Sequence, residues 1–157
     1  VLDNIHPERI PESFPEEMLA ALPISNLSLI NTESDVKASP PEGLFEPVQQ
    51  PNWCLYFEDA ELAGQRGDWA QVAELGDRAF SLRDQSNDET ELFIFLEGYL
   101  RAGRLEPARE VSEYLRARAQ WQSDLAICRL WQRVERETPG GYDPDFDVEG
   151  VYRDFCY

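Results

Sequence analysis

The chain has 157 residues and a formal net charge of −17, from 31 acidic and 14 basic side chains. This length suits one domain with its own core, and a hydrophobic content of 42% argues against a disordered chain. The charge disfavours binding to nucleic acids or anionic lipid surfaces, because both need clustered basic residues. No apolar run is long enough to span a bilayer. Because the first residue is Val1 rather than Met, we expect a piece of a longer protein.

Residues 1–52 form a proline-rich arm with a charge of −7. Proline fixes φ and removes a backbone donor, so the arm is predicted to be mostly extended. A short helix is predicted at residues 15–22, and the alternation of polar and apolar residues at 26–30 is typical of a short strand. Apolar side chains predict that the arm packs on the rest of the chain. They are Leu19, Leu22, Leu27, Leu29, Ile30, Leu44 and Phe45.

Residues 53–137 carry apolar side chains at helical spacing and a charge of −6. Asp68 is the expected N-cap of the second helix and Ser123 that of the fifth. Five helices are predicted, at about 53–66, 69–82, 89–102, 106–118 and 123–137. One face of the fifth helix carries Leu125, Cys128, Trp131 and Val134. Residues 138–157 carry a charge of −4 and no clear helical period, so they are predicted to form an acidic, aromatic tail.

The first two helix pairs can be aligned on each other with a period of 36 residues, which matches Ala60 with Leu96 and Gly67 with Gly103. The aligned segments are YFEDAELAGQRGDWAQVAELGDRAF and FIFLEGYLRAGRLEPAREVSEYL. They resemble the tetratricopeptide repeat over about residues 53–118, although the period is longer and Asp84 replaces the family's closing proline. The resemblance implies an all-α fold: a short helical solenoid of about five helices with the arm packed on it.

A second resemblance comes from the order of the segments. The proline-rich arm, then PNWCLYFEDAELAGQRGDW, then FIFLEGY is similar to the soluble C-terminal region of certain bacterial polytopic membrane proteins with a glycosyltransferase-like membrane part. This resemblance implies a location on the extracytoplasmic side of a bacterial membrane, with the cytoplasm as the alternative.

The repeat resemblance also implies a docking surface, because the first helix of each pair lines the concave groove of a tetratricopeptide array. This groove would be aromatic and acidic, and suited to a protein or peptide segment. Its expected residues are Phe57, Glu61, Gln65, Phe93, Glu97 and Arg101. Two other interpretations stay open. The phenylalanines can be core residues with the glutamates on a solvated face, or Arg101 can neutralise Glu97 from one turn away.

The sequence also disfavours a catalytic site and a metal site. Glu61 and Glu97 could suggest glycoside hydrolysis, but coincidental pairs are expected among 31 acids. The tail segment DPDFDVEG has the alternating acids of a calcium loop, yet Val148 stands where that loop needs glycine. With one histidine, His6, and three scattered cysteines, we expect no catalytic residue, no metal and no cofactor. Whether any cysteines pair stays open.

The sequence therefore predicts a non-enzymatic helical-repeat module for protein–protein interaction, as the extracytoplasmic C-terminal domain of a bacterial membrane protein. The alternative is an accessory domain of a membrane glycosyltransferase that positions a glycan or a lipid-linked donor. In a third interpretation, the arm or the tail fills the groove within the chain or in a dimer.

Overall fold

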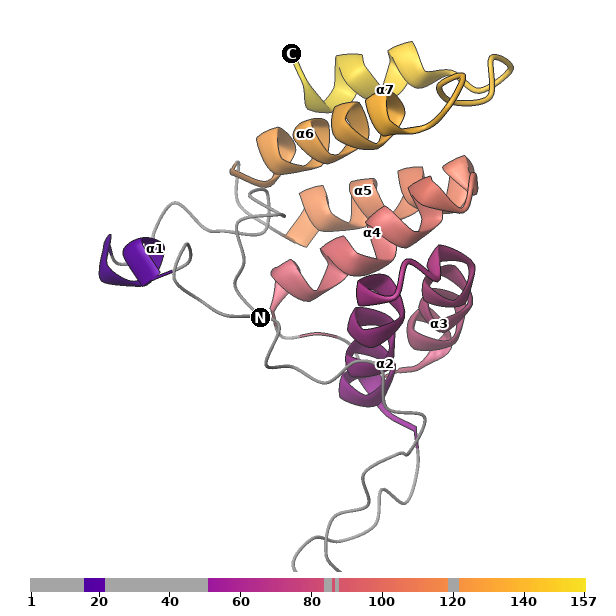
Figure 1. Cartoon of the computed structure of the whole chain (residues 1–157). Coiled ribbons are helices and arrows are strands. Elements are labelled where there is room, and N and C mark those ends of the chain that lie inside the picture. Colours follow the sequence, from indigo (N-terminus) through magenta and orange to yellow (C-terminus); the bar gives the residue numbers. More distant parts are fainter. Residues whose placement is uncertain (1–15, 22–50, 84–85, 87, 119–121) are drawn as a thin grey trace, which may run out of the picture.

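The computed structural model describes residues 16–21, 51–83, 86, 88–118 and 122–157 (Figure 1). Every regular element among these residues is helical, which confirms the predicted all-α class. The short helix predicted in the arm is present as α1, Glu16–Ala21. The strand predicted at 26–30 lies outside the described residues, and so does most of the arm. None of the described helices is long and apolar enough to cross a membrane.

The helices predicted between residues 53 and 137 form close to the expected bounds. They are α2 (Trp53–Gln65), α3 (Trp69–Ser81), α4 (Leu92–Arg101, preceded by the 3₁₀ turn η4, Glu89–Glu91), α5 (Leu105–Arg118) and α6 (Gln122–Glu137). Asp68 caps α3 as expected, since its side chain accepts a hydrogen bond of 3.1 Å from the Gln71 amide. The cap expected at Ser123 is wrong, because α6 begins one residue earlier and encloses Ser123 in its first turn.

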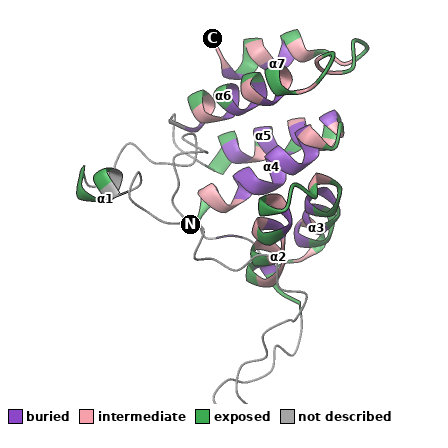
Figure 2. Ribbon diagram, viewed as in Figure 1, coloured by how far each residue is buried: buried purple, intermediate pink, exposed green. Residues whose placement is uncertain are grey.

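The helices stack as antiparallel pairs in chain order. Figure 1 shows α2 and α3 at one end, α4 and α5 in the middle, and α6 with α7 (Val148–Phe155) at the other end. α4 packs against α2, α3, α5 and α6, so it is the central helix of the stack. Its residues from Leu92 to Leu100 are all buried (Figure 2).

The turns within the first two pairs are built alike. Gly67 and Gly103 have φ of 72° and 70°, a left-handed conformation that favours glycine. The Gly67 amide donates to the Gly64 carbonyl and the Asp68 amide to Ala63. At the second turn the Gly103 amide donates to Leu100 and the Arg104 amide to Tyr99. Each of these positions lies 36 residues after its counterpart, so the aligned sequences form the same turn.

A close contact between α3 and α4 depends on Gly98. A Cβ built at Gly98 would come within 2.3 Å of Cγ1 of Val72, far closer than two carbon atoms can approach. Both Val72 and Gly98 are buried. The absent side chain thus lets the two helices approach each other, and the second helix pair packs tightly on the first.

The C-terminal segment differs from its prediction. Instead of an irregular tail it forms α7, capped at its first turn by Asp147, whose side chain accepts from the Gly150 amide at 2.9 Å. Val151 and Phe155, one turn apart, are buried. A disulfide joins Cys128 of α6 to Cys156, while Cys54 is free and exposed. Val148, Val151, Tyr152 and Phe155 lie at helical spacing, so the sequence carried a short period that the prediction of a tail did not use.

One position on α6 also differs from its prediction. Leu125 is 48% exposed, whereas Ile127 and Leu130 are fully buried beside Cys128, Trp131 and Val134. The buried stripe therefore begins after the first turn of α6. Trp131 also contacts the C-terminal segment, with Phe146 stacked on its ring and Tyr142 edge-on.

Candidate functional site

The residues expected to line the docking groove do not share one open surface. Their exposures differ: Phe57, Glu61 and Arg101 are half-buried, Gln65 is exposed, and Phe93 and Glu97 are buried. Glu97 has no exposed surface at all. The phenylalanine and glutamate of α4 are thus parts of the interior, and only the residues of α2 and part of Arg101 reach solvent. The physical reason is that α6 packs on α4, as α4 does on α2.

Glu97 is the centre of a buried group of charges. Its carboxylate accepts a hydrogen bond of 2.7 Å from Nε of Arg101, one turn later on α4. Arg133 of α6 donates to the same carboxylate through both terminal nitrogens, at 3.2 Å and 3.1 Å. Arg101 and Arg133 each also pair with Glu137. We call these four residues, Glu97, Arg101, Arg133 and Glu137, the inner cluster.

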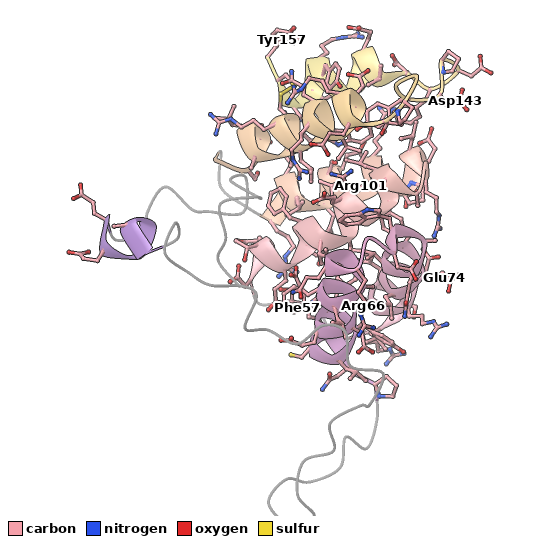
Figure 3. The ribbon with its side chains drawn as sticks, in the orientation of Figure 1. Phe57, Arg66, Glu74, Arg101, Asp143 and Tyr157 are labelled. Atoms are coloured by element: carbon pink, nitrogen blue, oxygen red, sulfur yellow. A yellow bond between two sulfur atoms is a disulfide. The ribbon has the colours of Figure 1, made fainter. Side chains whose placement is uncertain are left out.

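The inner cluster has no net charge and its members neutralise one another. Burial alone would lower the pKa of Arg101, but the ion pairs with Glu97 and Glu137 outweigh it and raise the pKa. The guanidinium of Arg101 also lies 4.8 Å from the ring centre of Trp69, at the start of α3. Figure 3 shows Arg101 at the level between α4 and α6. The cluster therefore connects the three layers of the stack, which are the helix pairs α2 and α3, α4 and α5, and α6 and α7.

This geometry bears on the roles considered for the glutamates. Glu97 is bonded by two arginines and sealed from solvent, so its carboxylate is not placed to meet a substrate. Internal neutralisation by Arg101, which the sequence left open, is what the structure contains. Arg133 was not recognised from the sequence. Its signal was its position, since it follows Glu97 by the same 36 residues that separate the aligned helix pairs.

A second group of polar residues joins α3 to α4 and to the turn that precedes α5. The hydroxyl of Tyr99 donates to the Asp77 carboxylate at 2.9 Å, and Arg104 donates to both oxygens of that carboxylate, at 2.8 Å and 3.0 Å. The hydrogen bonds from Arg104, with a smaller contribution from Tyr99, hold the pKa of Asp77 below its usual value despite partial burial. Burial, followed by the bond to Asp77, raises the pKa of Tyr99, so its hydroxyl stays a donor.

This group was not recognised from the sequence, although Gly76 gave a signal for it. Glycine inside a helix is unfavourable, and its presence calls for a reason. A Cβ at Gly76 would approach the Tyr99 hydroxyl oxygen to 2.8 Å, so the glycine makes room for Tyr99 to reach Asp77. The group borders a cleft of about 600 Å³, which Asp77, Tyr99 and Arg104 line together with residues of α5.

The acids of the C-terminal segment serve local structure. Asp147 caps α7, and Asp143 accepts a hydrogen bond from the Asp145 amide at 2.9 Å. Within the described ranges, no three side chains of His, Cys, Asp or Glu come together as a metal site would require.

No protein-family model matches this chain, and no curated protein or solved structure matches it.

Proposed function

We propose that this chain is a non-enzymatic helical-repeat module, built like a tetratricopeptide array, that docks a segment of a partner protein. The observation that carries the proposal is the spacing of the inner cluster. Glu97 pairs with Arg133 and Arg101 with Glu137, and each partner lies 36 residues further along the chain. The first two helix pairs are separated by the same 36 residues. In this proposal α6 is therefore the first helix of a third pair, and α7 is its second helix.

The proposed docking surface is the outer face of α2. Phe57, Glu61 and Gln65 lie at intervals of four residues, so they share one face of the helix. Figure 3 places Phe57 at the surface of α2. Phe57 and Glu61 are half-buried and Gln65 is exposed, so a partner can reach all three. The face offers an aromatic contact beside a carboxylate, which suits a segment with one apolar and one basic side chain.

Selection from a displayed peptide library tests this proposal. We expect enriched peptides to combine an apolar residue with a basic one, and to bind more weakly to variants Phe57→Ala and Glu61→Gln. Glu74→Gln is the control, because Glu74 is exposed on α3 and lies on the other side of the first helix pair from Phe57 (Figure 3). Equal binding to Phe57→Ala, Glu61→Gln and Glu74→Gln, or no enriched sequence at all, would contradict docking on α2.

We further propose that the module belongs to a bacterial membrane protein and lies outside the cytoplasm. The disulfide between Cys128 and Cys156 supports this location, because such bonds persist in oxidising compartments and are rare in a reducing cytosol. Thiol counting tests the proposal: cells are quenched with acid, which traps the thiols as they are in the cell, and the chain is then denatured and alkylated at neutral pH. One reactive thiol, that of Cys54, is expected, and three reactive thiols would contradict the location.

A further inference from the structure

The cleft between α3 and α5 has the composition of a recognition site for a cationic side chain. It encloses about 600 Å³ and lies between the second helices of the first two pairs. The proposed docking face belongs to α2, a first helix, so the cleft is a separate surface. Three aromatic rings and three charged groups border it: Phe80, Tyr99, Tyr114, Asp77, Arg104 and Glu110.

The charge that a ligand would meet in this cleft is that of Glu110. Asp77 and Arg104 form a two-bond ion pair and cancel each other. Arg109, next to Glu110 on the chain, pairs with Glu113 at 3.3 Å. Among the charged groups that line the cleft in the described structure, Glu110 is the one left over. Its carboxylate is exposed on α5, at the edge of an aromatic cavity.

The rings beside the cleft already bind guanidinium groups of this chain. Arg104 lies 5.0 Å from the ring centre of Tyr99, and Arg118 lies 5.3 Å from that of Tyr114. Phe80 and Tyr114 meet edge to face at 6.3 Å, an arrangement that keeps both rings at fixed angles. Cations prefer ring faces within about 6 Å, and a flexible basic side chain gains more where a carboxylate is within reach.

We propose that this cleft binds an arginine side chain from an extended partner peptide, with the guanidinium against the aromatic wall that Phe80 and Tyr114 form together and paired with Glu110. This inference rests on the proposed function, because it assigns a second contact to the same kind of partner. Arginine fits better than lysine, since its planar group both stacks on rings and forms two parallel bonds to one carboxylate. The chain's charge of −17 would also speed the approach of a basic segment.

The test uses two synthetic peptides on the full, isotope-labelled chain. One is acetyl-Gly-Gly-Arg-Gly-Gly-amide, and the other carries citrulline in place of arginine, which keeps the shape and removes the charge. Binding is followed by amide chemical shifts at low and at moderate salt. We expect the arginine peptide to perturb amides of residues 77–81 and 108–114, and the citrulline peptide to bind at least about tenfold more weakly.

Protein variants complete the test. Glu110→Gln should weaken the arginine peptide by about threefold to fivefold, as expected for an exposed ion pair. Glu106→Gln removes an exposed acid of the same helix that does not line the cleft, and binding should stay within about twofold. Tyr114→Leu should weaken the binding of both peptides. Circular dichroism of each variant checks that its helices remain.

Three results would overturn the inference: equal affinity for the two peptides, equal effects of Glu110→Gln and Glu106→Gln, or shifts confined to α2. The last result would refute the cleft and leave docking on α2 intact. Conversely, the library peptides could bind Phe57→Ala as tightly as the unmodified chain and bind Glu110→Gln more weakly. That result would refute docking on α2 and support the cleft. The two proposals therefore fail independently.

Discussion

Glu97 and Arg133 face each other across two layers of the helical stack, with both terminal nitrogens of the arginine bonded to one fully buried carboxylate. One turn further along both helices the signs are exchanged, because Arg101 on α4 pairs with Glu137 on α6. Each charge on α4 thus lies opposite a charge of the other sign on α6. If one of the two helices were shifted by one turn along the other, like charges would face each other. The charges of the inner cluster therefore favour the observed register of α4 and α6 over one shifted by a turn.

Removing the charge of Glu97 should destabilise the fold strongly. Glu97→Gln leaves two largely buried arginines without their shared carboxylate, and we expect a loss of about 2 to 4 kcal/mol in the free energy of unfolding. Urea denaturation followed by circular dichroism measures it. Glu113→Gln is the control, because Glu113 forms an exposed pair with Arg109 and its loss should cost less than about 1 kcal/mol. Equal effects of the two substitutions would show that the inner cluster contributes no more than a surface pair.

Gly98→Ala should destabilise the contact between α3 and α4, although alanine is the better helix former. The added methyl group would overlap Val72, and overpacking of this kind costs about 1 to 3 kcal/mol. The combination of Gly98→Ala with Val72→Ala should cost less than the sum of the two single changes, because the smaller residue makes room. Additive effects in this double-mutant cycle would mean that the two side chains do not compete for space.

Reduction of the disulfide should loosen α7. Cys128 and Cys156 are 28 residues apart, and closing a loop of this length stabilises a fold by about 3 to 4 kcal/mol in the chain-entropy model. Hydrogen exchange with and without reductant, in a Cys54→Ser background, should show faster exchange in residues 148–155 and little change in α2 and α3. Uniform acceleration along the whole chain would mean instead that the stack unfolds as one cooperative unit.

Alkaline titration should expose buried tyrosines only on unfolding. Burial raises the pKa of Tyr99 and Tyr152, and hydrogen bonds to Asp77 and Glu135 raise it further. A pKa that is higher in the folded state gives stability that is complete below the unfolded value of 10.0 and declines as pH rises above it. The tyrosinate absorbance of Tyr99 and Tyr152 should therefore appear in step with the loss of helical circular dichroism. An increase that precedes unfolding and accounts for all six tyrosines would contradict this burial.

The sequence predicted the helices of residues 53–137 because their apolar spacing and turn glycines are local signals. Gly67 and Gly103 ended helices where expected, and Asp68 began one. The surroundings of Glu97 could not be predicted in the same way, because its burial depends on α6, a helix that follows 25 residues after it in the chain. A carboxylate on an amphipathic helix normally faces solvent, and only the register of the third layer places Arg133 beside it.

The short C-terminal helix and the disulfide were missed for other reasons. α7 has eight residues, and its apolar positions, Val148, Val151, Tyr152 and Phe155, give a helical period of only about two turns. Its stability comes from contacts made elsewhere, such as the guanidinium of Arg116 at 4.9 Å from the ring centre of Phe155. Spacing alone likewise does not pair cysteines, since three residues allow three pairings and one free thiol in each.

The measurement that tests the central claim most directly is the affinity of a library-selected peptide for Glu97→Gln, taken at a temperature where that variant is folded. The account assigns Glu97 to the interior and docking to the face of Phe57 and Glu61. It therefore predicts an affinity within about twofold of that of the unmodified chain, and a clear loss for Glu61→Gln. A loss of about tenfold or more for Glu97→Gln, with binding unchanged in Glu61→Gln, would show that the partner contacts Glu97 and would contradict the account.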